Sequence, residues 1–270
     1  MKIGFIGGGQ MGFALIGGLV RSGVASAKHI TVCDTDTSAR DRLSTAYGVA
    51  TTDDARGAVD GVDAVVIALK PQVIPTVLPG IADSITVEQT VLSIAAGLST
   101  GTLESLLGAT DARPVRIVRA MPNTPALIGS GISAVCGGKH ATEDDIKRAE
   151  GILGAVGEVV RVLESQMDAV TGLSGSGPGF VYLVIEALAD GGVRAGLPKA
   201  LALKLATQTV LGAAKMVADT GEHPAVLRDR VTSPGGTTIA GLHAAEAAGL
   251  RNALISAVYA AAKRSEELGG

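Results

Sequence analysis

The chain has 270 residues, of which 47% are hydrophobic and 18% are charged, and its formal net charge is −3. This length and composition predict one large domain or two modest ones, and they exclude an intrinsically disordered chain. The charge shows no electrostatic footprint of a nucleic-acid partner. Cys33 and Cys136 lie far apart and outside any CxxC or Cys/His pattern, which argues against a disulfide framework and a metal site.

A mean hydropathy of +0.38 raises the question of a membrane segment. The longest uncharged stretch of interest, residues 169–185, holds four glycines and a proline near its centre, so we expect a turn there and no spanning helix. Residues 2–7 are typical of a strand that runs into a glycine turn, not of a signal peptide. We therefore expect a cytoplasmic protein with no membrane partner, whose high apolar content suggests an oligomer interface.

Short apolar runs alternate with helical patterns through the first half of the chain. Strands are predicted at residues 3–6, 29–33, 64–69, 91–94 and 115–119, with further candidates at 132–136 and 158–162. This alternation predicts an α/β fold with a doubly wound, mostly parallel sheet. Such a sheet binds ligands beyond the carboxyl ends of its strands.

After about Glu164 the pattern becomes helical. Residues 180–189 are apolar nearly all round, as in a buried helix, and a second helix is expected from Leu197-Pro198 to just before Gly221. Two more are expected, one from Thr237 onward and one over residues 250–268. We therefore predict two domains, residues 1–164 with the sheet and residues 165–270 all α-helical. The many small residues of the second domain suit a dimer bundle.

A glycine-rich turn follows the first predicted strand. Residues 7–12, Gly-Gly-Gly-Gln-Met-Gly, fit the GxGxxG pattern and open a helix. The glycines permit a tight turn, close approach of the backbone to a pyrophosphate, and close packing of helix on strand. Free N–H groups at the helix start favour the bound anion. The alternative is a purely structural glycine turn.

Asp34 ends the second predicted strand, 22 residues after Gly12. An acid there accepts hydrogen bonds from an adenine ribose diol and repels a 2′-phosphate, which favours NADH. The polar side chains that follow can hold a phosphate if Asp34 turns away: Thr35, Thr37, Ser38 and Arg40. A third interpretation is that residues 34–38 only cap the next helix. The choice between NADPH and NADH stays open.

Three more strand ends carry unusual loops, at residues 68–72, 95–97 and 121–125. In this fold we expect them to converge on the cofactor, where small residues let the nicotinamide half pass close to the backbone. Asn123 offers both a donor and an acceptor. The prolines in these loops have a plainer alternative role, which is to stop the strands.

The strongest pattern lies in the helical half. Residues 231–242, Val-Thr-Ser-Pro-Gly-Gly-Thr-Thr-Ile-Ala-Gly-Leu, place a glycine pair and several hydroxyls at the start of a helix. Free N–H groups, assisted by Ser and Thr hydroxyls, suit a carboxylate ligand. A helix cap without a ligand is the alternative, but a cap requires one hydroxyl and not four.

Six segments together resemble the pyrroline-5-carboxylate reductase family: residues 3–11, 68–72, 121–125, 170–178, 189–192 and 232–242. The match spans essentially the whole chain, and Ser-Pro-Gly-Gly-Thr-Thr at 233–238 is the most specific motif. The resemblance implies reduction of 1-pyrroline-5-carboxylate to L-proline with NADPH or NADH, the last step of proline biosynthesis. It also implies an N-terminal Rossmann domain and a C-terminal helical dimerisation domain, interleaved with that of a second subunit in a dimer or ring of dimers.

Carried over by position, the resemblance implies site residues of two kinds. Those for the cofactor are Gly7, Gly9, Gln10, Met11, Gly12, Asp34, Ala68, Leu69, Lys70, Ala95, Ala96 and Asn123. Those for the substrate are Ser233, Gly236, Thr237 and Thr238. Thr238 is the catalytic candidate, as a hydrogen-bond partner of the ring nitrogen or carboxylate and a proton relay. A protonated imine is already an electrophile, so no catalytic histidine and no metal are expected.

The chain departs from the family pattern at two positions, and three other classes of protein are alternatives to this interpretation. Asp34 stands where many members have Ser, Asn or Arg, and an adenosine-contacting Asn is replaced near Asp54. A β-hydroxyacid dehydrogenase of the same architecture has a Gly-x-Gly-x-x-x-Lys-x-x-x-Asn motif, whose last two functional positions here are Val181 and Ile185. A related imine reductase and a non-catalytic nucleotide-sensing protein complete the three classes, and the intact residues 233–238 count against the sensor.

Overall fold

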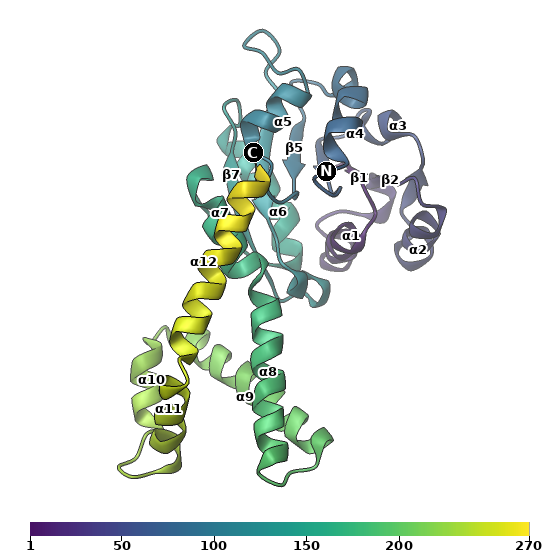
Figure 1. The fold of residues 1–270 in the computed structure, drawn as a ribbon. Coiled ribbons are helices and arrows are strands. Elements are labelled where there is room, and N and C mark those ends of the chain that lie inside the picture. The colour runs from purple at the N-terminus through teal and green to yellow at the C-terminus, as the bar shows by residue number, and fades with distance from the viewer. Residues whose placement is uncertain (270) are drawn as a thin grey trace. The chain divides into compact units, whose positions relative to one another are not determined.

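The structure is a computed structural model and describes residues 1–269. The sheet-containing part of the chain is built on an eight-stranded sheet of order β3-β2-β1-β4-β5-β6-β7-β8. Figure 1 labels several of these strands. The strands are β1 (Ile3–Ile6), β2 (Ile30–Cys33), β3 (Ala50–Thr52), β4 (Ala64–Ile67), β5 (Thr90–Ser93), β6 (Arg116–Met121), β7 (Gly131–Gly137) and β8 (Gly157–Arg161). Neighbouring strands are parallel except β6 and β7. The predicted mostly parallel sheet is therefore confirmed, and β3 is the strand that the sequence analysis missed.

Helices cover both faces of this sheet, as a doubly wound fold requires. One face carries α1 (Gln10–Ser22), α2 (Thr37–Tyr47) and α6 (Glu143–Leu153), and the other carries α3 (Ala55–Val59), α4 (Ile74–Ile81) and α5 (Thr100–Leu106). Successive strand residues point to opposite faces, so Phe5 and Ile6 enter two separate hydrophobic cores. Short 3-10 turns lie at Ala27–His29, Ala82–Ser84, Thr124–Ile128, Gly154–Val156 and Glu164–Gln166.

The glycine-rich segment after β8 is helical, so the turn predicted within residues 169–185 is wrong. Helix α7 (Met167–Val170) runs into a π-helical turn (Thr171–Gly175) and then into α8 (Gly177–Arg194). The π turn is closed by the amide of Ser176, which donates to the Thr171 carbonyl oxygen at 2.8 Å. Such wide turns keep the backbone hydrogen-bonded through a helix, and the glycines are accommodated there. None of the helices within residues 1–269 combines the length and the apolar character that a bilayer crossing requires.

The remaining helices are α9 (Lys199–Thr220), α10 (Pro224–Arg230), α11 (Thr237–Ala247) and α12 (Leu250–Gly269). Helix α9 ends as predicted, because Gly221 adopts the left-handed conformation (φ 64°) and closes its last turn. Helix α10 was not predicted. Helix α8 differs from its predicted burial: among the described residues it buries Ala189 alone, while Tyr182 and Leu183 are 60% and 66% exposed. Its apolar surface is thus left largely uncovered within the helical unit.

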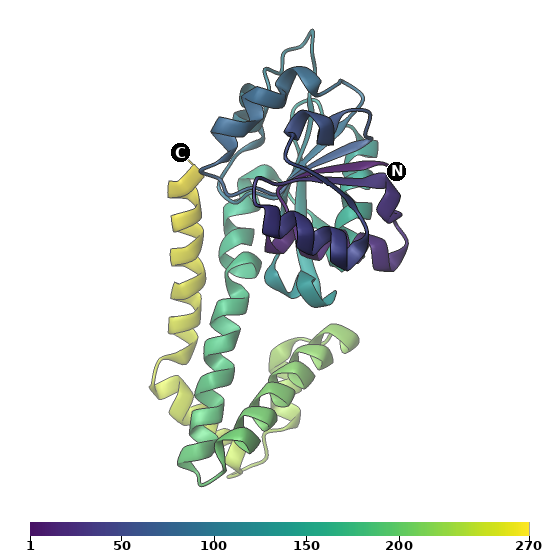
Figure 2. The same cartoon turned by 90° about the vertical axis from the view of Figure 1, so that its right-hand side faces the viewer.

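The packed chain separates into two compact units. The sheet unit comprises Met1–Ser176 and the residues from Ala260 onward, and the helical unit comprises Gly177–Tyr259. Helix α12 contributes to both, and its C-terminal half packs with the sheet unit (Figure 2). Residues 165–176 and the end of α12 therefore pack with the sheet unit, whereas the sequence pattern predicts a domain boundary after residue 164.

Candidate functional site

The turn between β1 and α1 requires glycine at two positions. Gly7 has a φ of 105°, and a Cβ there would overlap the carbonyl oxygen of Ala68 at the end of β4. A Cβ on Gly12 would lie 2.7 Å from the carbonyl oxygen of Gly7. The Gly7 amide donates to the Cys33 carbonyl oxygen at 2.8 Å, which ties the turn to the end of β2. The glycines therefore let three strand ends meet at the point where the strand order reverses.

Gly9 leaves open space above the start of helix α1. It is exposed, and a Cβ added there meets no atom within 4 Å. Gly9 is the N-cap, with no side-chain hydrogen bond to the helix, and the Phe13 amide makes the first bond back to its carbonyl at 2.8 Å. The amides of Gln10, Met11 and Gly12 thus begin the helix without an intrahelical acceptor. This arrangement fits a pyrophosphate.

Asp34 links the glycine turn to the loop after β2. Its carboxylate accepts hydrogen bonds from the Gly8 amide at 2.7 Å and from the Asp36 amide at 2.9 Å. The helix-cap interpretation applies to Asp36, whose side chain accepts from the Ser38 amide at 2.8 Å at the start of α2. Arg40 donates to the Asp34 carbonyl oxygen at 2.6 Å. Asp34 is therefore held at the pocket edge and is not a cap.

A pocket of about 260 Å³ lies beside this turn. It is lined by Gly9, Gln10, Asp34, Asp36, Ser38, Ala39 and Arg42. The Arg42 guanidinium donates to the Gly8 carbonyl oxygen at 3.1 Å and lies 4.5 Å from the centroid of the Phe13 ring. Hydrogen bonds from Ser38 lower the pKa of Asp36, so that carboxyl is ionised at neutral pH. The pocket thus offers carboxylate acceptors for hydroxyls and one guanidinium for a phosphate.

The other predicted cofactor residues follow β4, β5 and β6. The Ala68 amide donates to the Ile6 carbonyl oxygen at 2.8 Å, which sets residues 68–70 beside the glycine turn. Ala95 and Ala96 follow the neighbouring strand β5. Asn123 already has two partners: its Nδ2 donates to the Ser174 carbonyl oxygen at 3.2 Å, and its Oδ1 accepts from the Ile132 amide at 3.0 Å. These hydrogen bonds of Asn123 stabilise the loop after β6. Its contact with the cofactor stays a prediction.

The hydroxyl-rich loop of the helical unit ends at the start of α11. Gly235 is left-handed (φ 67°), and the Gly236 amide donates to the Ser233 carbonyl oxygen at 3.0 Å. Gly236 is the N-cap and has no side-chain hydrogen bond to the helix. A Cβ on Gly236 would lie 2.3 Å from the Ser233 hydroxyl, so a side chain there would push that hydroxyl aside. No hydroxyl of the loop therefore caps α11, so the alternative of a simple helix cap is wrong.

The predicted substrate hydroxyls are available to a ligand. Within residues 1–269, the side chains of Ser233, Thr237 and Thr238 make no hydrogen bond, and the first two residues are exposed. They surround a helix start whose amides also lack a side-chain cap. Hydroxyls and amides gathered in this way fit a carboxylate. This group lies in the helical unit, whereas the predicted cofactor residues lie in the sheet unit.

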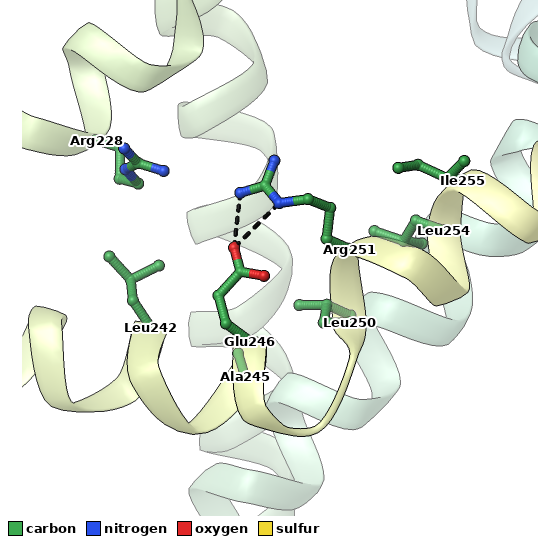
Figure 3. A pocket seen from close by; sticks show the side chains of 8 residues that line it. All are labelled: Arg228, Leu242, Ala245, Glu246, Leu250, Arg251, Leu254 and Ile255. Carbon is green, nitrogen blue, oxygen red and sulfur yellow. Dashed lines mark hydrogen bonds and ion pairs between the residues drawn. The ribbon is translucent and has the colours of Figure 1, made fainter.

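A second pocket, of about 380 Å³, lies among α10, α11 and α12 in the helical unit (Figure 3). Arg251 donates to Glu246 Oε1 from Nη2 at 2.6 Å and from Nε at 3.2 Å. Most of the remaining lining is aliphatic, and Leu250 and Ile255 are 48% and 62% exposed. Neither Ser233 nor Thr238 lines this pocket, so we do not assign the substrate to it. Its exposed leucines and isoleucine, like those of α8, suit contact with another subunit.

The sheet unit also holds a buried ionic cluster that the sequence does not predict. Arg119, in the middle of β6, is 5% exposed and faces Glu164 and Asp168. The available signal was an arginine within an otherwise apolar strand, but its partners lie more than 40 residues away. No grouping of His, Cys, Asp and Glu among the described residues is arranged to hold a metal ion.

These features define a class of protein. A sheet with the order 3-2-1-4-5-6 at its core and a GxGxxG turn at its switch point belongs to dinucleotide-binding oxidoreductases of the Rossmann type. Two family models match the chain: "NADP oxidoreductase coenzyme F420-dependent" over residues 2–97 and "Pyrroline-5-carboxylate reductase dimerisation" over residues 164–268. The chain therefore combines a nucleotide-binding half with a self-associating helical half.

Full-length relatives identify the family. The pyrroline-5-carboxylate reductase of Methanosarcina acetivorans is 47% identical over 268 residues, which is 99% of this chain and 98% of the relative. That of Arabidopsis thaliana is 46% identical over 99% of this chain and 95% of the relative. The chain belongs to the pyrroline-5-carboxylate reductase family.

Solved structures agree with this assignment. The reductase of Coxiella burnetii is similar at a TM-score of 0.92 and 38% identity, over 100% of this chain and 98% of that one. The Plasmodium falciparum enzyme, which was solved with NADP bound, is similar at a TM-score of 0.89 and 31% identity, over 100% and 98% of the two chains.

Proposed function

We propose that this protein reduces 1-pyrroline-5-carboxylate to L-proline, with NADPH or NADH as the hydride donor, as the last step of proline biosynthesis. The observation that carries the proposal is the unobstructed Ser-Pro-Gly-Gly-Thr-Thr loop at the start of α11, in a chain that matches the family from end to end. Loop hydroxyls and helix amides that have no internal partner are what a small carboxylate needs.

The sheet unit holds the cofactor in this proposal. The amides that open α1 bind the pyrophosphate above Gly9, where the space is open, and Asp34 lies at the edge of the adjoining pocket. Residues 68–70 and 95–96 line the path toward the nicotinamide. When bound, the reduced nicotinamide supplies the hydride.

The helical unit holds the substrate. Ser233, Gly236 and Thr237 bind its carboxylate, and Thr238 hydrogen-bonds the ring nitrogen or the carboxylate. Hydride adds to the carbon of the protonated C=N bond, the π electrons move to nitrogen, and the nitrogen keeps its proton, so the product is the secondary amine. Because the protonated imine is already electrophilic, the contribution of the chain is mainly orientation. Thr238 is our candidate for relaying the proton that the imine nitrogen acquires beforehand.

Both cofactors have support in the pocket beside the glycine turn. Asp34 and Asp36 favour a free ribose diol, whereas the Arg42 guanidinium is a donor for a 2′-phosphate. We propose that the protein uses both cofactors. The two carboxylates repel a 2′-phosphate and so reduce any preference for NADPH over NADH. We also propose a cytoplasmic location, where NADPH and NADH are regenerated, and a dimer or ring of dimers as the assembly.

The test is a pair of initial-rate measurements with the purified protein and 1-pyrroline-5-carboxylate, one with NADPH and one with NADH. Turnover with proline as the product supports the reductase. A folded protein that binds either cofactor but turns over with neither would contradict it and leave the nucleotide-sensing role. The same assay with a six-membered cyclic imine tests for a related imine reductase. An assay of a β-hydroxyacid with NADP⁺ or NAD⁺ tests for a β-hydroxyacid dehydrogenase.

A further inference from the structure

A buried guanidinium organises the region where β6, α5, α7 and α12 meet. Arg119 Nη1 lies 3.5 Å from Glu164 Oε1, and its Nη2 lies 4.0 Å from Asp168 Oδ1. The Arg119 side chain is 6% exposed, while each carboxylate is 35% exposed. A charge buried to this extent needs its partners in place, so Arg119 restrains both acids.

Each of the two acids also accepts hydrogen bonds from a helix. Glu164 accepts hydrogen bonds from the Thr100 amide at 2.6 Å and from the Thr100 hydroxyl at 2.7 Å, at the first residue of α5. Asp168 accepts from the Ser265 hydroxyl at 2.6 Å, in the last half of α12. Ser265 is 4% exposed and is the buried residue of α12 within the described chain. One ionic cluster thus joins the start of α5 to the end of α12.

The last turn of α12 also touches the loop that follows β5. Gly97 is buried and left-handed (φ 79°), and a Cβ on it would lie 3.4 Å from the carbonyl carbon of Leu268. A Cβ on Gly269 would lie 2.5 Å from the Gly97 carbonyl oxygen. The two backbones are therefore in contact. Both views show the C-terminal end of α12 beside the sheet unit (Figures 1 and 2).

We propose that this C-terminal clasp, made of Arg119, Glu164, Asp168, Ser265 and the contact between Gly97 and Gly269, positions the loop of residues 95–97 for the cofactor. The proposal rests on the proposed function, in which Ala95 and Ala96 line the path to the nicotinamide. Ala95 is buried in the core on one side of the sheet, but neither alanine has a polar group to hold the loop, so the placement of the loop also depends on what packs behind it. The clasp residues are positioning residues and touch neither the cofactor nor the substrate.

Helix α12 is one continuous helix, and its residues are divided between the two units. The helix begins at Leu250 in the helical unit and ends against residue 97 in the sheet unit. A shift of its last turn displaces the Gly97 backbone directly, because no flexible side chain lies between the two backbones. Small displacements of a reacting group from its proper geometry are costly to an enzyme.

The test is the variant Gly269→Ala, which adds a methyl group against the Gly97 carbonyl. Its control is Gly151→Ala in α6, where an added Cβ meets no atom within 4 Å. We expect Gly269→Ala to raise both the Kd and the KM for NADPH by about three- to tenfold. The KM for 1-pyrroline-5-carboxylate at saturating NADPH and the oligomeric state should stay unchanged. NADPH affinity equal to that of the control would overturn the proposal.

A second set of variants tests the polar half of the clasp. Ser265→Ala and Asp168→Ala should each weaken NADPH binding. The double variant should bind NADPH as tightly as Asp168→Ala alone, because both changes remove the same hydrogen bond, the one between Ser265 and Asp168. Additive effects would contradict the clasp. The Kd is measured from NADPH fluorescence and needs no turnover, so it tests the clasp even if the wild-type protein fails to reduce the imine.

Discussion

The Gly8 amide donates a 2.7 Å hydrogen bond to the Asp34 carboxylate, which binds the glycine turn after β1 to the acid that ends β2. The other oxygen accepts from the Asp36 amide at 2.9 Å. Two backbone amides therefore fix the direction of this carboxylate. A carboxylate has further lone pairs, so Asp34 can still accept from ribose hydroxyls in the adjoining pocket.

The first prediction concerns cofactor choice. Asp34→Asn removes the negative charge while keeping the size and one acceptor oxygen of the side chain. We expect the ratio of kcat/KM for NADPH to that for NADH to rise about tenfold, because repulsion of a 2′-phosphate is lost and the diol loses an acceptor. The control is Asp41→Asn, at an exposed position of α2 that does not line the pocket. An unchanged ratio would show that Asp34 only holds the turn.

The second prediction separates two glycines of the same turn. Gly9→Ala places a methyl group in open space, so the free energy of unfolding should change by less than about 1 kcal/mol. The same methyl group stands where the pyrophosphate approaches, and NADPH affinity should fall at least tenfold. Gly12→Ala meets the Gly7 carbonyl and should lower stability itself. Thermal unfolding and NADPH titration of both variants check this, and a stable Gly9→Ala protein with normal affinity would contradict it.

The third prediction concerns the substrate loop. Thr238→Ala should lower kcat/KM for 1-pyrroline-5-carboxylate by about 10- to 100-fold, the usual effect of losing a hydrogen bond to a charged group. Thr238→Ser keeps the hydroxyl and should recover most of the loss. The Kd for NADPH should be unaffected, and Thr45→Ala on the exposed side of α2 serves as the control. Wild-type kcat/KM in Thr238→Ala would remove this residue from the site.

Strands and helix ends with strong local patterns were predictable from the sequence, and weak ones were not. The strand β4 is a run of four fully buried apolar residues, whereas β3 has only Ala50, Thr51 and Thr52, none of which is buried. The glycines and the proline of residues 172–179 predict a turn, because clusters of these residues mark turns and loops. Hydrogen bonds between successive helical turns, together with the close packing of Met121 on Gly175, override that preference.

The parts of the candidate site also differ in how far the sequence predicts them. The glycine turn and the loop before α11 consist of neighbouring residues, so their spacing alone indicates their chemistry. The clasp joins Gly97, Arg119, Asp168 and Ser265, whose contacts arise only when the sheet has formed and α12 has returned to it. The exposed apolar face of α8 is a related case, since the sequence predicts burial but not which chain provides it.

The fourth prediction is a pH dependence of stability caused by Cys136. Burial in β7, with a smaller contribution from Glu164, raises the pKa of this thiol from 9.0 to about 11, against the opposing effect of Arg119. The unfolded chain therefore loses this proton at a lower pH than the folded chain. The stability that the thiol contributes is complete below pH 9 and is lost as the pH rises to 11, on the order of 3 kcal/mol. Urea unfolding of wild type and Cys136→Ala at pH 8, 9, 10 and 11 measures it. The variant should be less stable at every pH below 9 but should fall less steeply above it, and parallel curves would show that the thiol does not titrate as its burial requires.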